Sequence, residues 1–271
     1  MGIDWVAVLA RLAEYVGSGV LAGSSLTLWR ARSALGAGWA TPLFLAAAAL
    51  LLAGSVAGFA DVTARATGVP ADAFNPAAWA RVLSGADFGP PMAARIALGA
   101  AALGVAATVG AGGRLGLALL VVAGAAALAS FAWTGHGASD MGLAGDVHLG
   151  ADVVHLLAAG VWLGALAVFA GVLSSRKRAK ASVEALAGAL SGFAGVGSAA
   201  VAALLATGLV NAWFLVGPAH VADLFSTLYG RLLAAKVALF LGMTALAAAN
   251  RWVLAPRLRV RAADAAAALR W

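Results

Sequence analysis

One apolar stretch decides the fold: residues 146–173 read DVHLGADVVHLLAAGVWLGALAVFAGVL, and the basic segment RKRAK at 176–180 follows it closely. A helix that crosses a bilayer needs about 20 mostly apolar residues, and this stretch supplies them. Basic residues directly after such a stretch are typical of the cytoplasmic end of a span. Residues 146–173 therefore predict a transmembrane helix.

The composition shows that this stretch is representative of the whole chain. Of 271 residues, 63% are hydrophobic and 11% are charged, against about 45–50% and about 25% in soluble domains. The net charge of +7 comes from basic residues at the ends of apolar runs, which indicates membrane orientation and no nucleic-acid partner. The absence of Cys excludes disulfides and thiolate metal sites. No phosphate loop, nucleophile elbow or HExxH motif occurs, so we expect no enzyme.

Six further runs are long and apolar enough to span a bilayer. The seven predicted spans are residues of about 4–29, 40–60, 90–110, 115–135, 146–173, 185–216 and 228–252. The segment 61–89 is expected to be an ordered outer loop or a short interfacial helix. The chain is thus predicted to be an all-α integral membrane protein, a polytopic helical bundle forming one domain over residues 1–271.

Basic residues alternate between the two sides of the predicted bundle. The basic side receives Arg30, Arg32, Arg114, the 176–180 segment and Arg251. Because basic loops stay in the cytoplasm, the N-terminus is predicted to lie outside.

A shift of 141 residues aligns two pairs of spans. Residues 14–23 fall on 155–164 with two matching glycines, and 83–95 fall on 224–236 with an aromatic–Gly pair and a cation seven residues after the aromatic. This pattern predicts two parallel four-span repeats, about 1–140 and about 141–271. The last residues then either begin an eighth helix or mark the loss of that span.

Ionisable residues inside the spans are the main functional candidates. Each costs about 2.5–3.5 kcal/mol on insertion scales, so such residues face the bundle interior. Arg11 and Glu14 lie in the first span, and Asp152 and His155 occupy the aligned positions of the fifth. His148, Asp152 and His155 form one stripe at i, i+4 and i+7. The stripe predicts a cation site; the alternative is that Arg11 pairs with Asp152 and Glu14 with His155, joining the repeats.

Imidazole and carboxylate groups also gather in the outer loops, and this donor set suits Cu(II). The predicted metal ligands are His155, His136, His148, Asp152, Glu14 and Asp140. A supporting polar network is expected from Arg11, Arg95, Lys236 and Asn211. Arg95 and Lys236 are expected to neutralise buried carboxylates or to hold an anionic group such as a haem propionate.

Several motifs in combination resemble the copper resistance protein D family (CopD/PcoD type). They are GH at 135–136, DVVHLLAAGVWLG at 152–164 with Trp162 and Gly164, TGLVN at 207–211, and TLYGRLLAAK at 227–236 with Tyr229 and Gly230. The resemblance implies an eight-span bacterial inner-membrane protein that handles copper passing from the periplasm to the cytoplasm or to cuproenzyme assembly. It also implies a periplasmic copper-binding partner of the CopC type.

Three hypotheses follow from these residues. In the first, copper ions enter at His136, His148 and Asp140 and reach His155, with Asp152 and Glu14, between the repeats. In the second, the protein is a bundle that binds haem b or performs redox chemistry, although a single deep His makes bis-His ligation poor. In the third, it is a membrane chaperone that docks a periplasmic copper carrier. The oxidation state of the copper stays open.

Overall fold

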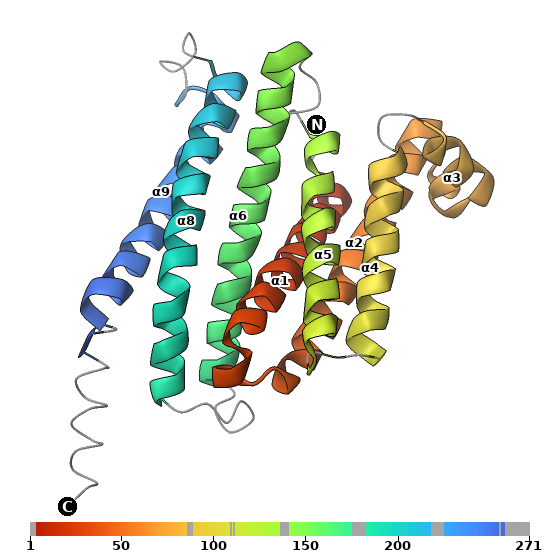
Figure 1. Ribbon diagram of the computed structural model, residues 1–271. Coiled ribbons are helices and arrows are strands. Elements are labelled where there is room, and N and C mark those ends of the chain that lie inside the picture. The colour runs from red at the N-terminus through yellow and green to blue at the C-terminus, as the bar shows by residue number, and fades with distance from the viewer. Residues whose placement is uncertain are drawn as a thin grey trace, which may run out of the picture.

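The computed structural model is a bundle of long helices that run along a common direction, with one short helix at its edge (Figure 1). It describes residues 4–85, 89–108, 110, 112–135, 141–174, 183–217, 225–254 and 256–257. Seven segments in these residues are long and apolar enough to cross a membrane. The prediction of an all-α polytopic membrane protein with seven spans is therefore confirmed. The predicted eighth span and His136 and Asp140 lie outside the described residues.

The helices follow the predicted spans closely. They are α1 (Trp5–Leu35), α2 (Thr41–Thr67), α3 (Pro76–Leu83), α4 (Gly89–Thr108), α5 (Arg114–Ser130), α6 (Gly142–Ser174), α8 (Val183–Leu215) and α9 (Leu228–Ala249). Short 3-10 segments are η1 (Gly38–Ala40), η2 (Pro70–Phe74) and η3 (Ala132–Thr134), and the π-helical turn η6 (Asn250–Leu254) follows α9.

The first two helices begin where predicted and continue past the predicted C-terminal ends of their spans to glycines that end them. Asp4 caps α1 by accepting a hydrogen bond from the Ala7 amide at 3.1 Å, as acidic N-caps do. Gly36 ends α1 with φ 64°, and Gly68 ends α2 with φ 72°, both in the left-handed region that glycine adopts without strain. The segment between α2 and α4 contains η2 and the short helix α3.

Helix α1 lies at the centre of the bundle and packs against α2, α5, α6 and α8. One apolar core joins these helices, with members such as Leu21, Phe44, Leu120 and Val168. Helix α9 lies at the edge of the bundle and slants away from its neighbours (Figure 1). Of its described residues only Gly230 is buried. The first half of the chain is therefore packed more tightly than the second.

Helices α1 and α6 cross in close contact at four glycines. A Cβ placed on Gly19 would lie 3.6 Å from the Gly160 Cα, and one placed on Gly164 would collide with Gly23 and the Ser24 nitrogen. The Ser24 hydroxyl also donates to the Gly164 carbonyl at 2.9 Å. Small residues spaced by four let helix backbones approach in this way in membranes. Gly19 lies against Gly160 and Gly23 against Gly164, the pairs that the 141-residue shift aligns.

Candidate functional site

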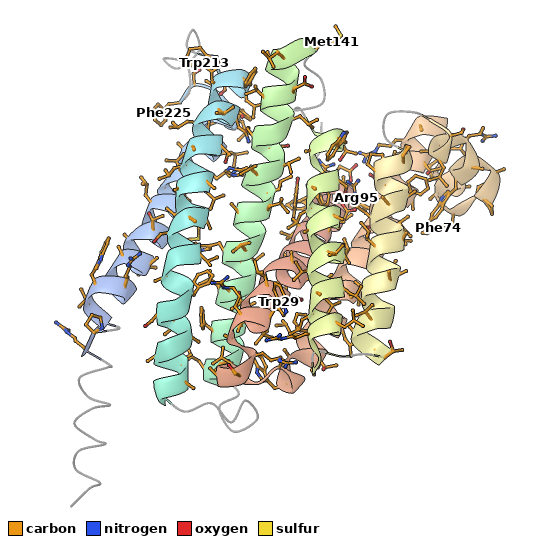
Figure 2. The ribbon with its side chains drawn as sticks, in the orientation of Figure 1. Trp29, Phe74, Arg95, Met141, Trp213 and Phe225 are labelled. Carbon is orange, nitrogen blue, oxygen red and sulfur yellow. The ribbon has the colours of Figure 1, made fainter. Side chains whose placement is uncertain are left out.

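The first polar site is a buried ion pair between α1 and α4. Arg95 Nε lies 3.2 Å from Glu14 Oε1, and the exposed fractions of the two side chains are 1% and 6%. Figure 2 shows Arg95 inside the bundle, toward the end at which α1 begins. Neutralising a buried carboxylate is one of the two roles predicted for Arg95. The structure thus places Glu14 with Arg95 and not with His155.

Aromatic and hydroxyl groups complete the surroundings of Arg95. Its guanidinium carbon lies 4.3 Å from the centre of the Phe131 ring, a cation–π contact that gains strength where water is excluded. Arg95 Nη1 also donates to Ser130 Oγ at 3.4 Å and to Thr134 Oγ1 at 3.3 Å. The Tyr15 ring also packs against the Phe131 ring, with ring centres 4.4 Å apart. Arg95 therefore contacts a carboxylate, an aromatic ring and two hydroxyl groups, all from the protein.

The second polar site lies between α6 and α8 and contains two of the predicted ligands. His155 Nδ1 is 3.0 Å from Thr207 Oγ1, and Asn211 Nδ2 donates to Asp152 Oδ1 at 3.4 Å. Asp152 and His155 are three residues apart on α6, and Thr207 and Asn211 are four apart on α8. The two helices run in opposite directions (Figure 1). Thr207 therefore lies beside His155 and Asn211 beside Asp152, so each candidate ligand has one hydrogen bond to α8.

The second site also has a nearby cation, Lys236, which the 141-residue shift aligns with Arg95 of the first site. Lys236 on α9 and Asp152 on α6 both act electrostatically on His155, in opposite senses. Lys236 is exposed, whereas His155 and Asp152 are half-buried. A cation beside a metal ligand weakens metal binding, while a carboxylate strengthens it. A basic and an acidic side chain thus act on the imidazole of His155 from different helices.

His148 does not lie open at the surface as its place in the predicted stripe suggested. It is 3% exposed, and its ring stacks on Phe214 of α8 with ring centres 4.6 Å apart. Apolar packing by α8 thus covers the imidazole. Asp146, two residues earlier on α6, is exposed.

The described residues do not bring the whole predicted ligand set together. Among them, no group of three or more His, Cys, Asp or Glu side chains could hold a metal ion. Glu14 pairs with Arg95, and the buried ring of His148 stacks on Phe214. Asp152 and His155 are the pair of predicted ligands that α8 holds by hydrogen bonds.

The other residues singled out from the sequence have packing positions. Arg11 is exposed on α1 and acts electrostatically on Glu14. Gly164 lies at the α1–α6 crossing, and Trp162 is half-buried on the same helix. On α9, Gly230 is buried and Tyr229 is exposed. Gly164 and Gly230 are thus packed against neighbouring atoms or buried, whereas Arg11 and Tyr229 are not.

Three partners of the two polar sites were not predicted as such: Ser130, Thr134 and Thr207. Thr207 is 9% exposed and lies in a long apolar run. Its sequence signal is the spacing of four from Asn211, which puts both polar groups on one face of α8. Ser130 and Thr134 are also four apart, at the end of α5 and in η3.

Comparison with known proteins identifies the family. The family described as "Copper resistance protein D-like, N-terminal domain" matches residues 2–146, more than half of the chain, and the family described as "Copper resistance protein D" matches residues 187–271. The chain belongs to the copper resistance protein D family. This result confirms the resemblance read from the motifs.

Two curated relatives match parts of the chain. A protein named Copper resistance protein D from Pseudomonas syringae pv. tomato is 44% identical over 161 residues, which cover 58% of this chain and 52% of that protein. Inner membrane protein YebZ from Escherichia coli (strain K12) is 31% identical over 130 residues, covering 47% of this chain and 42% of that protein. The matched part thus spans about half the length of each relative. No solved structure matches the chain.

Proposed function

We propose that this membrane protein moves copper ions across the bacterial inner membrane through a site formed by His155 and Asp152. One observation carries the proposal: two side chains that ligate metals lie on one face of α6, inside a span, and α8 holds each with a hydrogen bond. Imidazole and carboxylate groups are ligands that copper accepts. Ionisable groups placed in this way mark ion pathways in membrane proteins.

The proposed orientation places the N-terminus in the periplasm and the basic ends of the helices in the cytoplasm. The structure gathers basic groups at one end of the bundle, where Arg32 of α1 donates to the Gly112 carbonyl beside Arg114 at 3.2 Å. Basic residues are retained on the cytoplasmic side. With this orientation, the site on α6 lies toward the periplasm, and copper moves inward from there.

The proposed route is shorter than the residues alone suggested. Copper enters from the periplasm, where the sequence predicts His136 and Asp140 as ligands, and then reaches Asp152 and His155. Glu14 is a poor next ligand, because Arg95 neutralises it and a cation there would meet the guanidinium. We therefore assign Glu14 and Arg95 to the scaffold of the transporter and not to the copper path.

Two other functions are less well supported. The haem hypothesis uses Arg95 and Lys236 to hold propionates, and Arg95 is already engaged by Glu14, Phe131, Ser130 and Thr134. The chaperone hypothesis, in which a CopC-type periplasmic carrier docks on the outer loops, shares the copper site with our proposal. It differs in expecting copper to bind without crossing the membrane.

The test is copper binding and copper flux with purified protein in liposomes. His155→Ala should lose copper binding and flux, and Asp152→Asn should weaken both, while the variants still insert and fold. Asp146→Asn is the matched control, because Asp146 is an exposed carboxylate on the same helix. Normal flux through His155→Ala would overturn the assigned site. Copper binding without flux in the unmodified protein would favour the chaperone hypothesis, and a Soret band would favour haem.

A further inference from the structure

Thr207 of α8 controls which nitrogen of His155 is available to a ligand. We propose that Thr207 is a positioning residue that holds His155 as its Nδ1-protonated tautomer, so that Nε2 is the atom that binds copper. The inference rests on the proposed function for its copper part. Its tautomer part concerns the protein alone and can be tested without metal.

The first step concerns the hydroxyl hydrogen of Thr207. A threonine hydroxyl carries one hydrogen and two acceptor lone pairs. Thr207 Oγ1 donates that hydrogen to the Ala203 carbonyl, one turn earlier in α8, at 2.6 Å. This bond to the i−4 carbonyl is the usual way in which a helical threonine satisfies its hydroxyl in an apolar environment. The hydroxyl then has only lone pairs left.

The second step is the 3.0 Å contact between Thr207 Oγ1 and His155 Nδ1. Because the hydroxyl hydrogen is used at Ala203, the hydroxyl can only accept from His155. Nδ1 must therefore carry the hydrogen. A neutral imidazole has one N–H, so its other nitrogen, Nε2, keeps the lone pair that a metal requires. Metal-binding histidines commonly have their second nitrogen oriented in this way by a neighbouring acceptor.

The third step concerns Asp152, whose two carboxylate oxygens have different surroundings. Asn211 Nδ2 donates to Oδ1 at 3.4 Å. The other oxygen, Oδ2, lies 3.6 Å from the place where a Cβ on Gly135 would stand. Oδ2 thus lies near Gly135, at the end of η3. One helix, α8, fixes Nδ1 and Oδ1 and leaves Nε2 and Oδ2 for the ion.

The decisive measurement is the tautomer of His155 in the copper-free protein. The chain contains four His residues, so ¹⁵N NMR of histidine-labelled protein gives few signals, and the loss of one in His155→Ala assigns it. We expect a protonated Nδ1 in the unmodified protein. A protonated Nε2 would overturn the proposal whatever the copper result.

A pair of variants tests the role of the hydroxyl. Thr207→Val keeps the shape and removes the acceptor, so copper affinity should fall about 10–100-fold, the range seen when partners of metal ligands are removed. Thr207→Ser should restore both the tautomer and the affinity. Thr63→Val is the matched control, because the Thr63 hydroxyl is buried and donates to the Phe59 carbonyl at 2.8 Å far from His155.

The outcomes separate the two proposals. Unchanged affinity in Thr207→Val, measured by binding of copper ions alone, would overturn the positioning role and leave the copper site standing. Copper binding that survives in His155→Ala would overturn the proposed function, while the tautomer measured without metal would still decide the role of Thr207. If Thr207→Val does not fold, Thr207→Ser and the unmodified protein still give the tautomer.

Discussion

The polar sites of the two halves occupy aligned positions and have opposite character. At the 141-residue shift Glu14 corresponds to His155, and Arg95 corresponds to Lys236. In the first half the two members form a buried ion pair at 3.2 Å. In the second half an exposed lysine acts on a half-buried imidazole that α8 holds from the other side.

The difference shows how one arrangement of helices serves two purposes. Opposite charges in the first half neutralise each other and are sealed from water, so the site joins α1 to α4. A histidine beside a lysine cannot form such a pair, and His155 is half-buried, so we infer that its imidazole can take a ligand. We infer that changes in the first half affect stability and that changes in the second half affect binding.

The largest expected effect comes from breaking the ion pair of the first half. Arg95→Leu should lower the free energy of unfolding by about 3–5 kcal/mol, because it leaves the Glu14 carboxylate buried without a partner. The measurement is unfolding in mixed micelles. Adding Glu14→Gln to Arg95→Leu should recover a large part of the loss.

Arg11→Gln is the control for this experiment. Arg11 lies one turn before Glu14 on α1 and acts on it through its charge, but Arg11 is exposed. It should change stability by no more than about 0.5 kcal/mol, as surface substitutions do. Equal losses in Arg11→Gln and Arg95→Leu would contradict the contrast between a sealed and an open site.

An intermediate effect is expected at the crossing that holds the two halves together. Gly164→Ala places a methyl group against the Ser24 nitrogen and Gly23, and overpacking of this kind costs about 1–3 kcal/mol. Gly188→Ala on α8 is the control, because a Cβ there meets nothing within 4 Å. It should be neutral or slightly stabilising in the same unfolding assay. A tolerated Gly164→Ala would show that the halves are joined elsewhere.

The smallest effect is expected at the cation of the second half. Lys236→Gln should strengthen copper binding about fivefold, since removing one exposed charge near the ion is worth about 1 kcal/mol. Arg231→Gln, an exposed cation change on the same helix, should leave the affinity nearly unchanged. Titration of the purified protein with copper measures both. Weaker binding in Lys236→Gln would show that the lysine supports the site.

The sequence is sufficient for the spans and for the depth of the polar residues, because hydropathy and charge are properties of single segments. It is not sufficient for the partners of those residues. Whether Glu14 meets Arg95 or His155 depends on how α1 is rotated about its axis, and the packing of α1 against α2, α5 and α6 sets that rotation. His148 shows the same limit, since only the arrival of Phe214 from α8 decides that its ring is covered.

The contact between Thr207 and His155 could be predicted from the sequence only in part. Thr207 and Asn211 show by spacing alone that α8 has a polar face, and Asp152 and His155 show the same for α6. What neither pattern contains is that the two faces meet, which requires the antiparallel packing of the two helices. The 141-residue shift carries part of the answer, because it aligns Glu14 with His155 and Arg95 with Lys236 on the residue numbers alone.

The glycine crossing of α1 and α6 has a consequence for depth in the membrane. Glu14 precedes Gly19 by five residues, and His155 precedes Gly160 by five, so each lies about 7.5 Å along its helix from the crossing point. Bilayers differ in thickness, and single helices answer by tilting or shifting. Two helices pinned to each other at their glycines must shift as one body. The protein therefore sets the level of one site against the other by its own backbone contact, independently of the lipid that surrounds it.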